Sequence, residues 1–381
     1  MKKAKVYGFA GKRLDTGETT VREAARKPCA EVEDWKMARQ KLIAMEGIMP
    51  RRADRGGPQD HPCGRRPRPG EARTRAARMI LRLATAAMVA APALAHADIL
   101  EVQPVTDDVW AIVGPTEQRS PENLGNNATF GLIETGAGAV LMDPGGSWKG
   151  AEMLHAVIRG LTDQPVVHVI NTGGQDHRWL GNGYWQAQGA TVIASEAAVA
   201  DQRARASMQM TALAQLIGDA LEGTEPSFAD VTFTDAYTLE LGGLRFEIVH
   251  PGPAHTPGDS FVLVPARDTV FTGDIVYVAR LLGVGAQSSI SGWPSAFEAV
   301  EATGAAHVVP GHGPATTMEK ARADTYDYLM HLRAEIGALI DEGGDIMEAP
   351  QVDQSDFAYL EQFEALAGRN AQMAFQQMEW E

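Results

Sequence analysis

The sequence predicts an α/β protein in which two β-sheets pack face to face between outer layers of helices, an αββα sandwich. Short apolar runs typical of buried strands alternate with stretches of helical spacing between residues 99 and 309. The strands fall into two blocks, each followed by helices, as an αββα sandwich requires. The chain has 381 residues, 44% of them apolar, which is enough for one large domain with a full core.

The individual elements follow from local patterns. The runs 128–133 and 139–143 flank the glycine turn 135–138 and predict a hairpin. Apolar spacing at Leu154, Val157, Ile158 and Leu161 predicts a helix over residues 148–161. Further strands are predicted over 99–103, 109–113, 166–170, 190–194, 244–249, 260–264, 269–271 and 306–309, and further helices from 180, over 196–221 and over 295–303.

The N-terminal quarter differs from the rest. Residues 1–78 are basic, contain many glycines and prolines and have little periodic apolar content, so we expect them to be disordered or not translated. Residues 79–97 predict a secretory signal peptide, because Arg82 precedes an apolar run and Ala95-His96-Ala97 forms a cleavage site. The alternative is a membrane anchor, but spanning a bilayer takes about 20 apolar residues and this run has 13.

Cleavage would start the mature chain near Asp98, in the periplasm, with no stable membrane insertion. Both cysteines, Cys29 and Cys63, would be lost, so any metal must be held by histidine and carboxylate. Residues 98–381 hold 13 of the 34 basic residues and 39 of the 49 acidic ones, a net charge of −26. This balance disfavours nucleic acid as a partner and favours a small-molecule substrate.

Four stretches place metal-ligating side chains directly after predicted strands, where α/β folds keep their chemistry. The candidate ligands are Asp176, His177, His255, Asp274 and His312. Four of these five have a simpler explanation. Asp176 and His177 could be a helix cap and a surface imidazole, Asp274 could support its loop, and His255 could donate a hydrogen bond beside the site.

The order of these motifs between Leu100 and Pro314 resembles the metallo-β-lactamase superfamily. The resemblance implies an αββα sandwich of the metallo-β-lactamase type over residues 98–316, with extra C-terminal helices over 317–381 packed on it. The tail, including Asn370 and residues 379–381, is similar to the periplasmic metallohydrolases associated with quinoprotein and sulfur-oxidation systems. A periplasmic quinoprotein system is therefore one expected partner, and the apolar faces of the C-terminal helices allow a homodimer.

The sequence also departs from the family pattern Asn-Thr-His-x-His-x-Asp-His. No histidine lies between Thr172 and Asp176, so two of the three ligands of the family's first metal position are missing and only His255 remains. By resemblance, the second position keeps Asp176, His177 and His312, with Asp274 as the carboxylate that would bridge two metals. We expect one zinc ion per chain rather than two, although iron and manganese also suit these ligands.

These residues imply a periplasmic metal-dependent hydrolase. A metal-bound hydroxide would attack a small ester, thioester, lactone or amide, and Asp176 or Asp274 would relay the proton. One alternative is a β-lactam hydrolase, and another is a non-catalytic periplasmic accessory or binding protein with a vestigial metal site. Asp143 is expected to hydrogen-bond the loops of the site, and Arg178 either to contact substrate or to pack. The sequence contains neither a Gly-x-Ser-x-Gly elbow nor a phosphate-binding P-loop.

Overall fold

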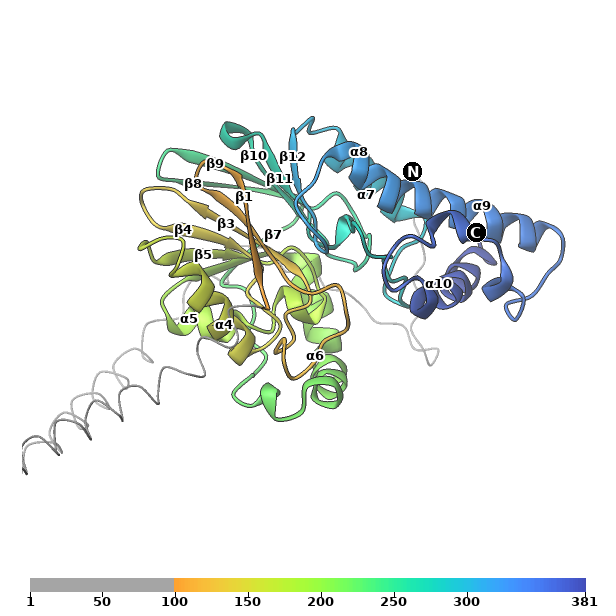
Figure 1. The fold of residues 1–381 in the computed structure, drawn as a ribbon, viewed down its shortest axis with the longest axis horizontal. Helices are drawn as coiled ribbons and strands as arrows, with labels where there is room; N and C mark the ends of the chain where they lie inside the picture. The colour runs from red at the N-terminus through yellow and green to blue at the C-terminus, as the bar shows by residue number, and fades with distance from the viewer. Residues whose placement is uncertain (1–98) are drawn as a thin grey trace, which may run out of the picture. The chain divides into compact units, whose positions relative to one another are not determined.

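The computed structural model describes residues 99–381, which belong to one compact unit (Figure 1). Two β-sheets pack between outer helices, with further helices at the C-terminus, so the predicted αββα fold is confirmed. The predicted signal peptide, the residues before it and both cysteines lie outside the described residues. Within residues 99–381 no helix has the length and apolar character needed to cross a membrane.

The first sheet has seven strands in sequential order. Strands β1 to β4 are antiparallel, and β4 to β7 run parallel to one another. The bounds are β1 (Glu101–Thr106), β2 (Val109–Val113), β3 (Thr129–Glu134), β4 (Ala139–Met142), β5 (Val166–Ile170), β6 (Thr191–Ser195) and β7 (Val231–Phe233).

The second sheet has five strands in the order β12-β11-β10-β9-β8. Its strands are antiparallel except for the last pair, β11 and β12, which are parallel. The bounds are β8 (Ala236–Leu241), β9 (Leu244–Val249), β10 (Phe261–Val264), β11 (Thr269–Phe271) and β12 (His307–Val309). Each sheet therefore contains parallel neighbours whose carboxyl ends share one edge, an arrangement that favours sites built from strand-end loops.

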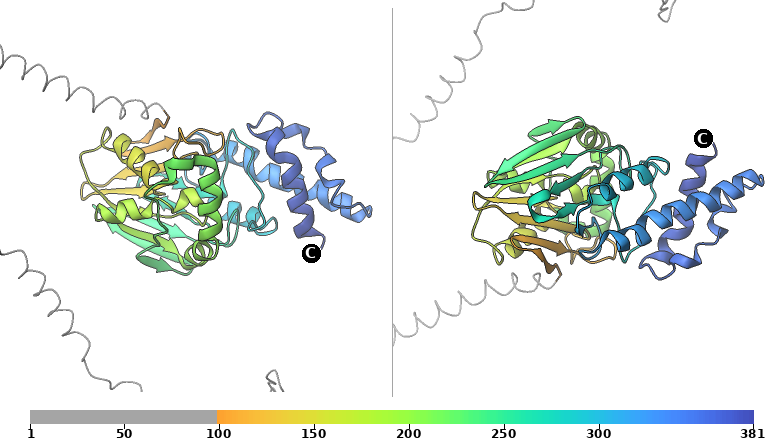
Figure 2. Two further views of the ribbon diagram at one scale, coloured as in Figure 1. Left: turned by 90° about the horizontal axis from the view of Figure 1, so that it is seen from below. Right: turned by 90° about the horizontal axis from the view of Figure 1, so that it is seen from above.

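Seven α-helices cover the sheets or extend from them within the described residues, and Figure 2 shows them from two further directions. Local sequence fixes their starts, since the hydroxyls of Ser147 and Ser195 accept hydrogen bonds from the first turns of α4 and α6. The α6 helix ends at Gly218, whose φ of 54° suits glycine. The bounds are α4 (Trp148–Ile158), α5 (Asn182–Ala187), α6 (Glu196–Ile217), α7 (Gly292–Glu301), α8 (Met318–Ala321), α9 (Asp327–Asp341) and α10 (Phe363–Met378).

Three apolar layers hold these parts together. One lies between α4, α5 and the outer face of the first sheet, and includes Leu141, Leu154 and Trp185. A second fills the space between the two sheets, with Phe246 and Phe271 at its centre. The third joins the second sheet to α7 and to the C-terminal helices, so core residues on both sides of position 316 share one cluster.

Candidate functional site

The candidate site lies where four strand ends meet. Asp143 follows β4, His177 lies in the 3₁₀ turn Asp176–Arg178 (η1) after β5, Asp274 lies in the turn Gly273–Ile275 (η4) after β11, and His312 follows β12. All four side chains are buried. The parallel pairs β4–β5 and β11–β12 bring these strand ends together from the two sheets.

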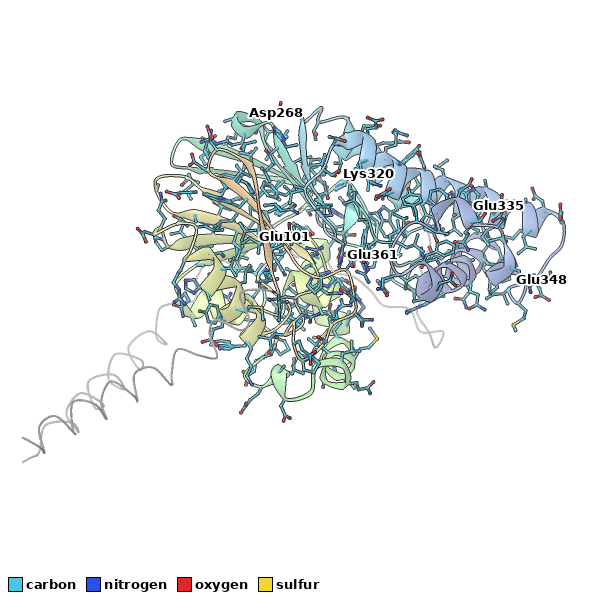
Figure 3. All side chains as sticks on the ribbon, viewed as in Figure 1. Glu101, Asp268, Lys320, Glu335, Glu348 and Glu361 are labelled. Atoms are coloured by element: carbon cyan, nitrogen blue, oxygen red, sulfur yellow. The ribbon has the colours of Figure 1, made fainter. Side chains whose placement is uncertain are left out.

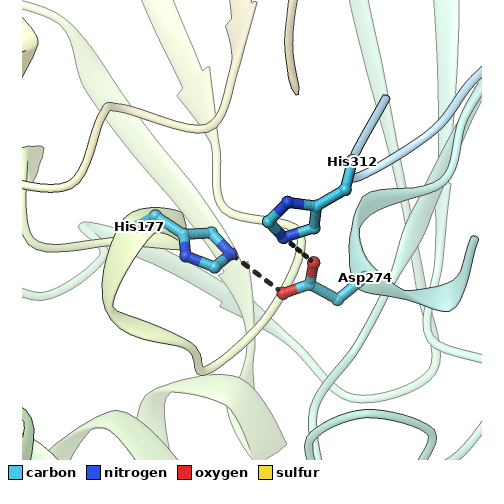
Figure 4. A group of neighbouring side chains, drawn as sticks. All are labelled: His177, Asp274 and His312. Carbon is cyan, nitrogen blue, oxygen red and sulfur yellow. Dashed lines mark hydrogen bonds and ion pairs between the residues drawn. The ribbon is translucent and has the colours of Figure 1, made fainter. Parts of the chain in front are cut away.

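His177, Asp274 and His312 form a compact group (Figure 4). The two carboxylate oxygens of Asp274 face the two imidazoles: Nε2 of His177 lies 3.2 Å from Oδ2, and Nε2 of His312 lies 3.3 Å from Oδ1. The two imidazole rings are nearly perpendicular, with centroids 5.0 Å apart. One ligand atom from each residue lies within 4.8 Å of the others, so the group could hold a metal ion.

Arg178 was expected either to contact substrate or to pack, and in the structure it joins the site's acidic groups. Its guanidinium is fully buried, with Nη1 2.8 Å from Oδ2 of Asp143 and Nη2 2.7 Å from Oδ1 of Asp274. It also donates to the backbone carbonyls of Thr129 and Gly311, at 3.2 and 2.7 Å. The only signal in the sequence is its position after His177, beside acidic residues that need a counter-charge when buried.

The charge of Arg178 sets the protonation of its partners. Burial raises the pKa of Asp274, but the charge of Arg178 and then that of His177 outweigh burial and hold this pKa well below its ordinary value. Burial likewise raises the pKa of Asp143, with Arg178 opposing the shift. Asp143 also accepts hydrogen bonds from the backbone N–H and the hydroxyl of Thr172, at 2.8 Å each, so its expected role in positioning a site loop is confirmed.

Asp176 lies beside the group of three but not within it. Its Oδ1 is bound by the guanidinium of Arg119, from the loop between β2 and β3, and accepts the backbone N–H of His177 at 2.9 Å. Nη2 of Arg119 also lies 2.8 Å from Nδ1 of His177. Burial raises the pKa of Asp176, but the charge of Arg119 outweighs it and brings the pKa below its ordinary value, so Asp176 is a carboxylate at neutral pH.

His255 also lies outside the group of three. Its Nδ1 is 3.0 Å from the carbonyl oxygen of Gly283, and its ring packs against Trp293 with centroids 5.4 Å apart. Burial lowers its pKa to about 4, so the ring is neutral at neutral pH. His255 and Asp176 both line the cavity above the group, where they can meet a ligand.

Gly173 and Gly174, in the segment before Asp176, lie where the structure has no room for a side chain. A Cβ atom at Gly173 would lie 2.4 Å from Oδ1 of Asp259, and one at Gly174 would lie 2.0 Å from Oδ2 of Asp201. Both distances are too short for non-bonded atoms, so these carboxylates fill the space that side chains at 173 and 174 would need. Among the described residues, three imidazoles line the cavity, those of His177, His255 and His312.

A cavity of about 320 Å³ opens above the group of three. Its walls come from the loop between β2 and β3, from η1, from α6, from residues 277–287 and from α10. The ring of Tyr277 stacks on His312 with centroids 4.6 Å apart, and Nη1 of Arg280 lies 3.0 Å from Nδ1 of the same histidine. The cavity thus joins the group of three to the C-terminal helices.

Part of this chain is similar to known proteins. The family model of the Metallo-beta-lactamase superfamily matches residues 125–312. Among solved structures, a metallo-β-lactamase from Pontibacter korlensis is 27% identical, with a TM-score of 0.48, and the match covers 58% of this chain and 95% of that one. The metallo-β-lactamase FIM-1 from Pseudomonas aeruginosa, in its mono-zinc form, is 20% identical with a TM-score of 0.46, covering 58% and 92%. The region matched by the family model contains both sheets from β3 to β12 and all three residues of the group.

Proposed function

We propose that this protein is a metal-dependent hydrolase that uses the group His177, Asp274 and His312 to hold one divalent ion. The observation that carries the proposal is the donor set: two imidazole nitrogens and one carboxylate oxygen within 4.8 Å of one another, all buried at the floor of a cavity. Three protein ligands with an open position are typical of catalytic zinc, and the same ligands also suit iron and manganese.

Two features support one ion rather than two. Arg178 already donates to Oδ1 of Asp274 and places a positive charge beside this carboxylate, which disfavours a second cation there. The backbone of Gly173 and Gly174 packs against Asp259 and Asp201, so this segment offers no side-chain ligand to a second ion. Zinc is the ion we expect, at one per chain.

The roles of the side chains follow from their contacts. A bound ion would supply Lewis-acid chemistry, activating water and stabilising negative charge on the oxygen of an ester, thioester, lactone or amide. Arg178 holds Asp274 as a carboxylate facing both imidazoles. Arg119 binds Oδ1 of Asp176 and keeps this residue ionised at the cavity wall. Among residues 99–381 no group donates a hydrogen bond to Oδ2 of Asp176, and we assign that atom to proton transfer with the reacting water.

One observation favours a second candidate, a binding protein without a catalytic metal. Three guanidiniums already contact the site: Arg178 on Asp274, Arg119 on His177 and Arg280 on His312. The last two lie on the Nδ1 atoms, whereas histidine ligands usually donate their second ring N–H to a carboxylate or a carbonyl. A metal-bound state would then need these two guanidiniums to move away from the rings.

The experiment that separates the candidates is metal analysis of the purified protein, with His177→Ala as the test variant and His331→Ala as the matched control. His331 lies on α9, and its ring is within hydrogen-bonding distance of the carbonyl of Asp353, outside the cavity. The hydrolase requires about one zinc, iron or manganese per chain in the wild type and in the control, and none in His177→Ala. A metal content near zero in all three proteins, not restored by added metal, would refute the hydrolase and favour the binding protein.

Cellular placement is part of the same proposal. The signal-peptide pattern of residues 79–97 supports export to the periplasm, and the tail supports a role beside a periplasmic quinoprotein system. Cell fractionation followed by N-terminal sequencing tests the first point, since the exported form should begin near Asp98. A substrate screen with esters, thioesters, lactones, amides and β-lactams, run with and without chelator, then identifies the reaction class.

A further inference from the structure

Basic side chains are concentrated at the cavity although this part of the chain is strongly acidic. Only 13 lysines and arginines lie in residues 98–381, against 39 acidic residues. Five of the 13 line the cavity or lie directly beneath it: Arg119, Arg178, Arg205, Arg280 and Arg369. Such a concentration focuses positive potential inside one pocket.

Most of the acidic residues, by contrast, lie on the outside of the described structure, and six aspartates are buried. Figure 3 labels four exposed examples in separate parts of the chain: Glu101 on β1, Asp268 before β11, Glu348 before the 3₁₀ turn Ala349–Gln351, and Glu361 before α10. Of the described residues that line the cavity, four are arginines and only Asp176 is acidic, while Asp143 and Asp274 lie beneath it beside Arg178. The cavity therefore differs in sign from the surface around it.

Three of the five arginines already have carboxylate partners. Arg178 binds Asp143 and Asp274, as described above, and Arg119 binds Asp176. Arg205 of α6 binds Asp201 one turn earlier and donates to the carbonyl of Gly174 at 3.1 Å. These three guanidiniums are neutralised within the protein.

Arg280 has no such partner. Within residues 99–381 it forms no ion pair, its one polar contact is Nη1 to Nδ1 of His312, and its Nε is buried without a hydrogen-bond partner. Burial of a cation is costly unless it is paired and hydrogen-bonded, and Asp274 and Glu117 favour the charge of Arg280 without forming an ion pair with it. The guanidinium of Arg280 lines the cavity, so an anion inside the cavity would meet it.

Arg369 adds a second unpaired charge at the same cavity. It is exposed on α10 and forms no ion pair with any residue of the 99–381 region. Its neighbour Asn370 holds this part of α10 against the loop after Arg280. Oδ1 of Asn370 accepts a hydrogen bond from the backbone N–H of Val284 at 2.8 Å, and Nδ2 donates one to the carbonyl of Leu282 at 2.7 Å. This arginine lies beyond residue 312, where the match to the superfamily ends.

We infer that the cavity binds a small anionic ligand whose oxyanion group, a carboxylate or a sulfate or phosphate ester, is held by Arg280 and Arg369. A planar guanidinium presents paired N–H donors that match two oxygens of such a group. The cavity volume of about 320 Å³ is at the lower end of small-molecule sites. The identity of the ligand as a substrate rests on the proposed function. If the protein is a hydrolase, the ligand is an ester, thioester, lactone or amide that also carries an anionic group.

Calorimetric titration of the metal-free protein with succinate, sulfate and inorganic phosphate tests the inference, with neutral succinamide as the control compound. Chelator removes any metal, so that an anion cannot bind to an ion instead of to the arginines. The test variants are Arg280→Gln and Arg369→Gln. Arg245→Gln is the matched control, because Arg245 lies exposed on β9 outside the cavity and its replacement changes the net charge equally.

We expect at least one of the three anions to bind and succinamide not to bind, and the preferred anion identifies the oxyanion class. Arg280→Gln should weaken that anion roughly tenfold to a hundredfold, as the loss of a charged hydrogen bond does. The exposed Arg369→Gln should weaken it a few-fold, and Arg245→Gln should leave it unchanged. Arg280→Gln should not lower the melting temperature, because it removes an uncompensated buried charge, so weaker binding cannot be attributed to unfolding.

The inference is overturned if no anion binds, if Arg280→Gln binds as tightly as the wild type, or if Arg245→Gln loses as much affinity as Arg280→Gln. These results are distinct from a failure of the proposed function. Anion binding by a protein that never takes up metal would refute the hydrolase and retain the anion site. Metal-dependent hydrolysis by a protein that binds none of the three anions would refute the anion site and retain the hydrolase.

Discussion

Replacing Arg178 with glutamine should be among the most destabilising changes in this protein. The side chain is fully buried and makes four contacts within hydrogen-bonding distance, two with carboxylates and two with backbone carbonyls. Glutamine is shorter and uncharged, so it cannot span Asp143 and Asp274. The substitution leaves two buried carboxylates without their counter-charge.

The expected loss can be bounded. Breaking a buried ion pair by removing one partner costs about 3–5 kcal/mol. Single domains have unfolding free energies of about 5–15 kcal/mol, so Arg178→Gln should remove a third or more of the total. Asp143→Asn in the same chain removes one of the stranded charges, so the double variant should lose less than the sum of the two single losses.

The assay is urea denaturation in the presence of chelator, followed by the fluorescence of the buried Trp179 and Trp293. Arg245→Gln serves as the control, because an exposed ion pair contributes about 0–1 kcal/mol. Adding zinc should then stabilise Arg178→Gln more than the wild type, since Asp274 would have lost its internal cation. A loss below about 1 kcal/mol, or strict additivity with Asp143→Asn, would refute the assignment of Arg178 as the counter-charge of this site.

Three further predictions follow from the same contacts. Gly311→Ala should abolish metal uptake and lower the free energy of unfolding by about 1–3 kcal/mol. The new Cβ would lie 2.3 Å from the carbonyl oxygen of Gly273 and 2.6 Å from Nη2 of Arg178. Metal analysis and melting curves check this prediction, and a normal metal content would contradict it. Asp259→Asn should flatten the pH dependence of stability. Burial and the charge of Asp274 raise the pKa of Asp259 to about 8 in the folded state, above its ordinary value near 3.9. Between these pH values the folded state holds an extra proton, so the wild type loses up to about 1.4 kcal/mol of stability per pH unit as the pH rises. Denaturation from pH 5 to 9 should then show the wild type falling relative to Asp259→Asn, and parallel curves would contradict the shift. Asn370→Ala should cost about 1–3 kcal/mol and expose the loop after Arg280 to proteolysis, because it leaves two buried backbone groups unpaired; unchanged proteolysis would show that α10 is held by its apolar contacts alone.

Much of the fold could be predicted because its signals are local. The strands Leu244–Val249 and Thr269–Phe271 have the predicted bounds, and the helix after Ser195 begins where its hydroxyl cap indicates. Strand β8 was not predicted, although Tyr237, Leu239 and Leu241 alternate with exposed residues and face the core between the sheets. It is held in place by pairing with β9, a contact between segments that its own sequence does not specify.

The residue order alone shows which side chains follow strand ends, since His177, Asp274 and His312 each come a few residues after an apolar run. It could not show that these three form one group while Asp176 turns to Arg119 and His255 turns to Gly283. Nor could it identify Arg178 as the partner of carboxylates 35 and 96 residues away in the chain. Strand ends are set by neighbouring residues, but charge pairing is set by distances of a few ångströms in space, and only the packing of the two sheets fixes those distances.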